Sequence, residues 1–325
     1  MKIVDFPKSS TIFFSQLLKL FIIIFSKMKI QVLLILLMAS LFTGCKVNNN
    51  EEKPKALEQK STTNNEEFES SVQHISNVEW KTEKISEAIL YKYHNFSDLF
   101  NSIQSVTIIE IDLNQKVRVD ISYLTSGFLK TSEAGLNVNA TAAINGSYFD
   151  TSKGGSTVFF KKDGEVINDT RENFTHYREN AGFAINASGN ISIHKKPSLG
   201  WQAVTSSTLL TSGPLLIYNG QLVEQVDEKF NTNRHPRTAI GITDDNRLIA
   251  TVVDGRNNQA EGMTIHEVAT LMQALGCKEA MNLDGGGSST VWIENLGVVN
   301  YPSDNKKFDN EGERGVANVI TFTQE

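Results

Sequence analysis

The fold is decided by the stretch LIATVVDGRNNQAEGMTIHEVATLMQALGCKEAMNLDGGGSS, residues 248–289. Two short apolar runs, 248–253 and 280–283, flank a helical signal. Thr264 and Glu267 have the spacing of a capping box, in which each side chain satisfies the other residue's exposed amide. Apolar residues then recur at helical spacing, at Ile265, Val268, Ala269, Met272 and Leu275, before Gly276 ends the run. The pattern predicts a strand, a helix over about 264–275 and a second strand, a crossover that joins parallel strands.

Outside this stretch, short apolar runs alternate with turn signals, a pattern typical of antiparallel hairpins. The turn signals are Asn114-Gln115, Asp163-Gly164, Ser188-Gly189-Asn190 and Asn219-Gly220. The first of them predicts a hairpin between residues 106–111 and 117–121. We therefore expect an α+β fold, with mixed, mainly antiparallel sheets and one capped crossover helix.

Composition excludes several classes of protein. The chain has 325 residues, of which 40% are apolar, and a net charge of −6. That charge argues against a non-specific nucleic-acid binder, whose affinity comes from neutralising phosphates. Two cysteines cannot frame a disulfide-rich fold. Because no Cys/His cluster has zinc spacing, we expect no metal site and no cofactor.

The first 45 residues have the layout of a secretory signal. Met28-Lys29 opens a basic region, residues 30–42 are apolar, and Thr43-Gly44-Cys45 resembles a bacterial lipoprotein processing box. We expect translation to start at Met28, and a lipid on Cys45 to anchor the protein in the membrane of a bacterial cell envelope, on its periplasmic or cell-surface side. The alternative is a buried apolar helix with a chance cysteine.

Residues 46–75 are rich in Asn, Glu, Lys, Ser and Thr. They hold too few apolar side chains to offset the entropy lost on ordering, which predicts a disordered tether. The remaining residues, 76–325, are then expected to form a single catalytic domain.

Two aspartates follow the two strands of the crossover. Asp254 ends the run 248–253, and Asp284 ends the run 280–283. Since the C-terminal ends of parallel strands share one edge of a sheet, we expect the two carboxylates to be neighbours. Neighbouring carboxylates suit acid–base chemistry because each raises the other's proton affinity. The alternative for Asp254 is a turn residue before Gly255.

Three glycines, Gly285, Gly286 and Gly287, follow Asp284 and precede the hydroxyls of Ser288 and Ser289. Successive bare amides form concave sites that hold phosphate oxygens. The run therefore predicts a phosphate-binding loop beside the aspartate, with a tight turn as the alternative.

Arginines suggest an anionic ligand at the same edge. Arg234 and Arg237 precede the apolar strand 238–242, and Arg256 follows Asp254. A planar guanidinium pairs well with phosphate or carboxylate. The alternative for Arg234 and Arg237 is a set of surface salt bridges.

A further strand, 142–144, ends in Asn145-Gly146. Read locally, Asn-Gly is as typical of a hairpin turn as of a functional site. The residues alone leave this choice open.

Six segments together resemble the phosphodiester glycosidase family, from about residue 137 to 322. They are Ala143–Phe149, Ser212–Leu216, Arg237–Gly241, Val253–Arg256, Asn282–Ser289 and Glu313–Asn318. The resemblance implies that Asn145, Arg237, Asp254 and Asp284 form one pocket, with Gly213, the glycine loop and Ser288 alongside. It also implies a sugar phosphodiester as the substrate.

The implied reaction is hydrolysis of a sugar 1-phosphodiester at the anomeric carbon. Arg237, Arg256 and the glycine amides would hold the phosphate, one of the two aspartates would act as base or nucleophile, and Asn145 would orient a sugar hydroxyl. Two alternatives remain open at this point. One is a phosphodiesterase that attacks phosphorus, and the other is a lipoprotein that binds a glycan or anion without turnover.

Overall fold

The computed structural model describes residues 68–325, and the expected signal, lipid site and most of the tether lie outside them. Residues 68–77 are helical, and Ile75 on this helix is fully buried. The expected domain boundary at residue 76 falls inside this helix, so the ordered domain starts at least as early as residue 68. Among the described helices, none is both long and apolar enough to cross a membrane.

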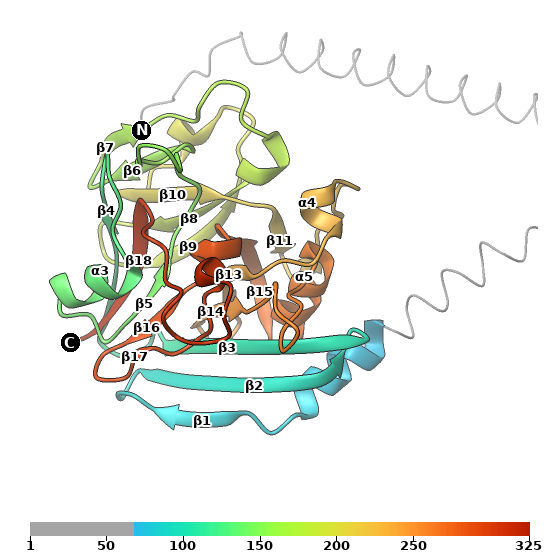
Figure 1. The fold of residues 1–325 in the computed structure, drawn as a ribbon. Helices are drawn as coiled ribbons and strands as arrows, with labels where there is room; N and C mark the ends of the chain where they lie inside the picture. Colours follow the sequence, from blue (N-terminus) through green and yellow to red (C-terminus); the bar gives the residue numbers. More distant parts are fainter. Residues whose placement is uncertain (1–67) are drawn as a thin grey trace, which may run out of the picture. The chain divides into compact units, whose positions relative to one another are not determined.

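Eight strands form the largest sheet of the described domain, and each pairs with its neighbours in antiparallel fashion (Figure 1). Across the sheet they are β1 (Lys81–Lys84), β2 (Ile89–Leu99), β3 (Ser102–Asp112), β14 (Arg247–Val253), β13 (Arg237–Thr243), β15 (Cys277–Asn282), β11 (Leu215–Tyr218) and β12 (Gln221–Leu222).

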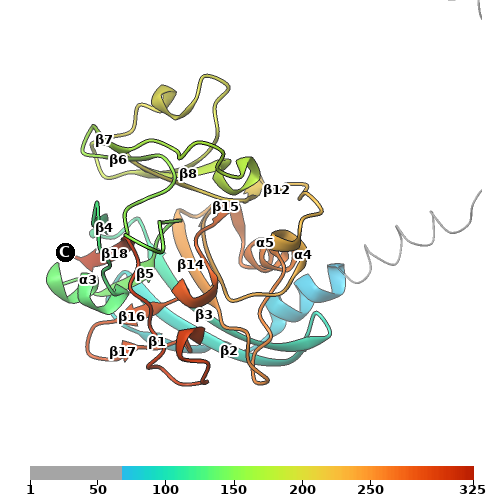
Figure 2. The same ribbon diagram turned by 45° about the horizontal axis from the view of Figure 1, so that its top comes forward.

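Two five-stranded sheets complete the domain, and Figure 2 shows the first of them as a separate layer. This β8 sheet has the order β7 (Glu165–Asn168), β6 (Phe160–Lys162), β10 (Thr208–Ser212), β8 (Ala181–Ile185) and β9 (Ile191–Lys195). The other, the β18 sheet, has the order β17 (Gly297–Val298), β16 (Val291–Ile293), β5 (Ala142–Asn145), β18 (Asn318–Gln324) and β4 (Val117–Tyr123).

The large sheet is buried on both faces because its central strands are apolar at successive positions. In β14, Leu248, Ala250 and Val252 join a core shared with both smaller sheets. Ile249 and Val253 point the other way, into a core with the helix α5 (Ile265–Ala274). Two shorter helices, α3 (Thr131–Asn137) and α4 (Lys229–Thr232), lie outside these layers. This mainly antiparallel α+β architecture confirms the expected fold class.

The predicted crossover is confirmed. Strands β14 and β15 both run antiparallel to β13, which lies between them, so they are parallel to each other. The helix between them begins at the predicted capping box, where the Glu267 amide donates to the Thr264 hydroxyl and the Thr264 amide donates to the Glu267 carboxylate. It ends before Gly276, whose φ of +84° favours glycine.

Three of the four predicted hairpins form, namely β6–β7, β8–β9 and β11–β12. The hairpin between 106–111 and 117–121 is wrong, because β4 pairs with β18 in another sheet. Both edges of β3 are already occupied, by β2 and β14, so β4 has no free edge to join. The hairpin alternative for Asn145-Gly146 is also wrong, since β5 pairs with β16 and β18.

Candidate active site

Asp254 and Asp284 reach the same edge of the large sheet but belong to different faces. Val253 pairs with Arg237, and the Leu283 amide donates to the Thr238 carbonyl, so both chains leave the sheet beside the start of β13. Side chains alternate between faces along a strand. Asp254 therefore lies on the same face of the sheet as Val252. Asp284 lies on the opposite face, together with Asn282.

The side chain of Asp254 is held by three hydrogen bonds within the protein. Its Oδ2 accepts from the Ser105 hydroxyl at 2.8 Å, and its Oδ1 accepts from the Asn300 amide and the Tyr301 backbone amide, both at 2.9 Å. Burial raises the pKa of Asp254 to about 6, and these three hydrogen bonds oppose the shift. None of these hydrogen bonds involves Asp284, so the expected pairing of the two carboxylates does not form among the described residues.

The surroundings of Asp284 are cationic. Burial raises the pKa of its carboxyl group. The Ser288 hydroxyl, the Gly285 amide and the positive charges of Arg178 and Arg314 all lower it and so favour the ionised form. A carboxylate next to guanidinium groups that approach from different parts of the chain is a typical environment for a reactive acid or base.

Arg178 is the residue of this site that the sequence analysis missed. Its guanidinium lies over the rings of Tyr148 and Phe230, at 4.4 and 4.3 Å from their centroids. Its buried Nε has no hydrogen-bond partner, and within residues 68–325 it forms no ion pair within 4 Å. A guanidinium that aromatic rings hold in place but that forms no ion pair suits an anionic ligand.

The turn that carries Arg178 is fixed from both sides. The neighbouring Glu179 is buried and accepts hydrogen bonds from Thr170, Lys196 and Trp201. On the other side, a Cβ on Gly213 would lie 2.7 Å from Oδ1 of Asn180 and 3.0 Å from the Tyr177 carbonyl oxygen, so the glycine lets its backbone pack closely on this turn. The predicted site residue Gly213 therefore positions Arg178, rather than presenting a functional group of its own.

Two more buried polar atoms near Asp284 lack partners among the described residues. One is Oδ1 of Asn282, whose Nδ2 donates to the Tyr148 hydroxyl and the Gly213 carbonyl. The other is the hydroxyl of Ser288, which lies beside Asp284 without forming a hydrogen bond of normal geometry. Unsatisfied buried polar groups are rare, and several at one place are typical of a ligand site.

The glycine run forms a tight turn, so its amides are less available than expected. Gly286 donates to the Pro236 carbonyl at 2.8 Å, and the Gly285 amide lies beside the carboxylate of Asp284. Neither the Gly285 amide nor the Gly287 amide donates to a backbone carbonyl of the described residues. The predicted concave set of amides thus loses one member, because the turn uses the Gly286 amide to hold itself together.

The two arginines predicted at the entrance of β13 are structural. Arg237 is 1% exposed and donates to the carbonyls of Met263, Phe230 and Asn233. Burial lowers its pKa to about 10.

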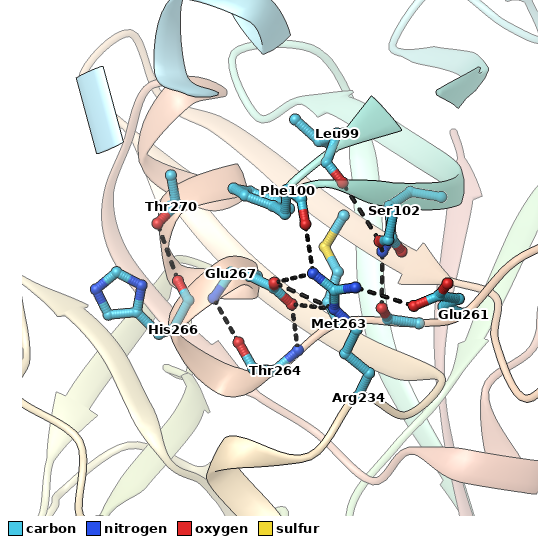
Figure 3. Close-up of polar contacts among 12 residues, drawn as sticks. Leu99, Phe100, Ser102, Arg234, Glu261, Met263, Thr264, His266, Glu267 and Thr270 are labelled. Carbon is cyan, nitrogen blue, oxygen red and sulfur yellow. Dashed lines mark hydrogen bonds and ion pairs between the residues drawn. The ribbon is translucent and has the colours of Figure 1, made fainter. Parts of the chain in front are cut away.

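Arg234 is also held by the protein, as Figure 3 shows. It pairs with the carboxylates of Glu261 and Glu267 and donates to the Phe100 carbonyl. The salt-bridge alternative therefore describes Arg234 well.

Asn145 and Ser289 hold the backbone of the site. The Asn145 amide donates to the Asp284 carbonyl at 2.8 Å, and its Oδ1 accepts from the Thr238 hydroxyl and the Thr290 amide. Ser289 accepts a hydrogen bond from the same Thr238 hydroxyl at 3.2 Å. Asn145 is fully buried, so its position suits it to orienting Asp284 rather than a sugar hydroxyl.

Arg256 and Arg314 flank the glycine turn. The guanidinium of Arg256 lies 2.9 Å from where a Cβ of Gly286 would be, and that of Arg314 lies 2.4 Å from where a Cβ of Gly287 would be. Arg314 is paired with Asp304, whereas Arg256 is exposed and forms no ion pair within the described part of the chain. Within the same part, no group of three or more His, Cys, Asp or Glu side chains is arranged to hold a metal ion.

Comparison with known proteins agrees with this arrangement of motifs. Residues 138–323, more than half of the chain, match the model of the phosphodiester glycosidase family. The chain belongs to the phosphodiester glycosidase family. All six motif segments of the sequence analysis lie within the matched range.

Curated relatives are similar to this chain over short stretches. It is 34% identical over 104 residues to the mouse N-acetylglucosamine-1-phosphodiester alpha-N-acetylglucosaminidase, which is 30% of this chain and 20% of the mouse protein. It is 37% identical over 90 residues to the SPbeta prophage-derived uncharacterized protein YomE of Bacillus subtilis (strain 168), which is 28% of this chain and 13% of that protein. Each match thus spans a fifth or less of the curated relative.

Solved structures share the fold of the family. The catalytic domain of the zebrafish N-acetylglucosamine-1-phosphodiester alpha-N-acetylglucosaminidase, auto-inhibited by its pro-peptide, matches with a TM-score of 0.57 and 22% identity, over 76% of this chain and 89% of that one. A hypothetical protein from Synechocystis matches with a TM-score of 0.55 and 14% identity, over 75% and 64%.

Proposed function

We propose that this protein hydrolyses a sugar 1-phosphodiester by breaking the bond between the anomeric carbon and the phosphate oxygen. One observation carries the proposal: the half-buried side chain of Asp284 lies within electrostatic reach of Arg178, a fixed guanidinium that forms no ion pair and whose Nε has no hydrogen-bond partner among the described residues. The name of the mouse relative, an enzyme acting on an N-acetylglucosamine 1-phosphodiester, supports this substrate class.

In this mechanism Arg178 binds the phosphate, and Arg256 and the Gly287 amide add positive potential on the side of the glycine turn. Asp284 takes a proton from a water molecule that attacks the anomeric carbon. The carbon–oxygen bond breaks, and its electron pair leaves with the phosphate. Because a phosphate monoester is already a stable anion, its departure needs no second carboxyl group as acid. One aspartate is therefore sufficient, and Asp254 can remain structural.

Hydrolysis in oxygen-18 water tests which bond breaks. Attack at the anomeric carbon places the label in the released sugar, whereas attack at phosphorus places it in the phosphate. The free sugar, incubated in the same water without enzyme, measures the exchange at its anomeric hydroxyl. Label in the phosphate monoester contradicts the proposal and identifies a phosphodiesterase.

A non-catalytic anion-binding protein is the second candidate, because an unpaired Arg178 also suits binding alone. The two candidates differ at Asp284, which a binding protein does not need as a base. Wild-type protein that binds a panel of sugar phosphodiesters but turns none of them over supports the binding protein.

We also propose that the protein acts at a bacterial cell envelope, anchored by a lipid on Cys45. The motif Thr43-Gly44-Cys45 supports this location. The full chain expressed in bacteria should partition into detergent, and the Cys45→Ser variant should not. Equal partitioning of both proteins contradicts the anchor.

A further inference from the structure

A cavity of about 350 Å³ lies between the β18 and β8 sheets, and neither Asp284 nor Arg178 lines it. Its walls come from the end of β4, the loop 150–157 and residues 167–171, with Asn318 at the start of β18. The volume lies at the lower end of the range for small-molecule sites. It suits a ligand of one or two rings.

Asn318 presents an unused hydrogen-bond donor to this cavity. Its Oδ1 accepts from the Ser147 backbone amide at 2.6 Å, and this contact fixes which end of the side-chain amide is oxygen. The opposite atom, Nδ2, is buried and has no partner among the described residues. Asn318 is 1% exposed and lines the cavity, so a ligand there is the natural acceptor for this donor.

The charges around the cavity are balanced. Asp150 and Asp169 supply two negative charges, and Lys153 and Arg171 supply two positive ones. Arg171 lies 3.6 Å from the Asp150 carboxylate, so this pair is largely compensated. A strongly charged ligand gains little from such a site, in contrast to the cationic surroundings of Asp284.

The other polar groups suit a ligand with many hydroxyls. The cavity is lined by the hydroxyl residues Thr125, Ser156 and Thr157 and by the amide of Asn168. Tyr123 forms an aromatic wall, and its ring packs edge-on against Phe160 at 5.0 Å. Planar amides and carboxylates next to an aromatic ring match the alternating polar and apolar surfaces of a sugar ring.

The rim of the cavity is rigidly built. Gly154 and Gly155 both adopt positive φ, +80° and +76°. A Cβ on Gly154 would lie 1.9 Å from the Gly127 carbonyl oxygen, and one on Gly155 would lie 2.5 Å from that of Thr125. The loop thus packs directly on the backbone of residues 125–127, which shapes the cavity before any ligand arrives.

We propose that this cavity binds one neutral pyranose unit of a glycan, with the Asn318 amide donating to a sugar hydroxyl. The proposal is independent of hydrolysis. The site lies close to Asp284 along the chain's hydrogen bonds, since the Gly146 amide donates to the Asn318 carbonyl and the Gly146 carbonyl accepts from the Asp284 amide.

Titration of the Asp284→Asn variant with glucose and with N-acetylglucosamine, followed by calorimetry or ligand-observed NMR, tests the proposal without turnover. We expect saturable binding of a neutral sugar in this background. Adding Asn318→Asp keeps the acceptor for Ser147 but removes the donor, and should weaken binding about tenfold. Adding Arg171→Ala at the exposed rim should weaken it less. A matched Lys195→Ala change on an exposed strand end should have no effect.

Two results overturn the proposal. One is the absence of saturable binding for both sugars. The other is binding that is unaffected by Asn318→Asp and Arg171→Ala but lost in Arg178→Ala, which places the sugar beside Asp284 instead. Unfolding temperatures of all variants are measured alongside, and Arg171→Ala keeps the test decisive if Asn318→Asp does not fold. Inorganic phosphate should not compete with the sugar in this cavity.

Discussion

Asp254 and Asp284 follow parallel strands at the same edge of the sheet, yet their side chains have different surroundings. Asp254 has three protein donors for its two oxygens, and these contacts hold it in place without any ligand. Asp284 is surrounded by groups that the protein leaves unsatisfied, among them Arg178 and Ser288. Burial raises both pKa values, so the shift alone does not separate a functional carboxylate from a structural one. The two carboxylates differ instead in the groups that surround them.

The largest expected difference between the two regions is in turnover. Asp284→Asn removes the proposed base and should lower kcat by about 10²–10⁴-fold, the usual contribution of such a group. Asp254→Asn changes no group near the unpaired arginine and should lower kcat less than tenfold. Steady-state hydrolysis of a sugar phosphodiester measures both variants. If Asp254→Asn is the more damaging change, the assignment is reversed.

Substrate affinity provides the control for that pair. An amide at position 284 keeps the shape of the carboxylate, and Arg178 remains free to bind phosphate. Calorimetric titration of Asp284→Asn with the intact phosphodiester should therefore give saturable binding. Loss of binding together with turnover argues that Asp284 supports the site structurally.

We expect Asp254 to affect the pH dependence of the free energy of unfolding rather than turnover. Its pKa is about 6 in the folded protein and near the ordinary 3.8 when unfolded, so the folded state binds this proton more tightly. The free energy of unfolding therefore falls as pH rises from about 4 to about 6, by about 3 kcal/mol, and the contribution is flat above 6. The Asp254→Asn variant has no titrating group at this position, so its free energy of unfolding lacks this pH-dependent contribution.

Urea unfolding of both proteins at pH 4, 5, 6 and 7 measures the difference. The stability of Asp254→Asn relative to wild type should increase with pH over this window. Asp284 and every other titrating group cancel in the comparison because both proteins contain them. A difference that stays constant from pH 4 to pH 7 contradicts a raised pKa at Asp254.

Sequence patterns predicted the elements of this fold better than their contacts. The capping box at Thr264, the crossover and three hairpins all form, because each depends on neighbouring residues and local backbone preferences. The hairpin after β3 fails because a distant strand, β14, occupies the edge that β4 would need. Local patterns carry no information about such competition.

The site shows the same division. Motif spacing predicted that Asp254 and Asp284 lie at one edge of the sheet, and the strand pairing agrees. Because side chains alternate between faces along a strand, a register difference of one residue places the two side chains on opposite faces. Arg178 carries no motif, and its only signal in the sequence is an arginine among aromatic residues, near Phe174 and Tyr177. Its importance arises from being unpaired, which only the packed structure reveals.

The smallest expected effect comes from replacing an arginine at the proposed phosphate site. It contrasts Arg178, which forms no ion pair, with Arg234, which pairs with two glutamates. Arg178→Ala removes the proposed phosphate donor and should raise KM for a sugar phosphodiester roughly 10- to 150-fold, the range for hydrogen bonds to charged groups. Arg178→Lys keeps the charge but not the planar contact with Tyr148 and Phe230, so it should recover only part of the affinity.

Arg234→Ala is the matched control, because Arg234 is held by Glu261 and Glu267 and is not part of the proposed phosphate site. It should lower the unfolding temperature and leave KM within about twofold. The contrast isolates the lack of a partner as the functional property, since the two changes remove the same side chain. Equal KM values for both variants contradict phosphate binding by Arg178 and favour Arg256, the exposed guanidinium at the glycine turn, as the group that holds the anion.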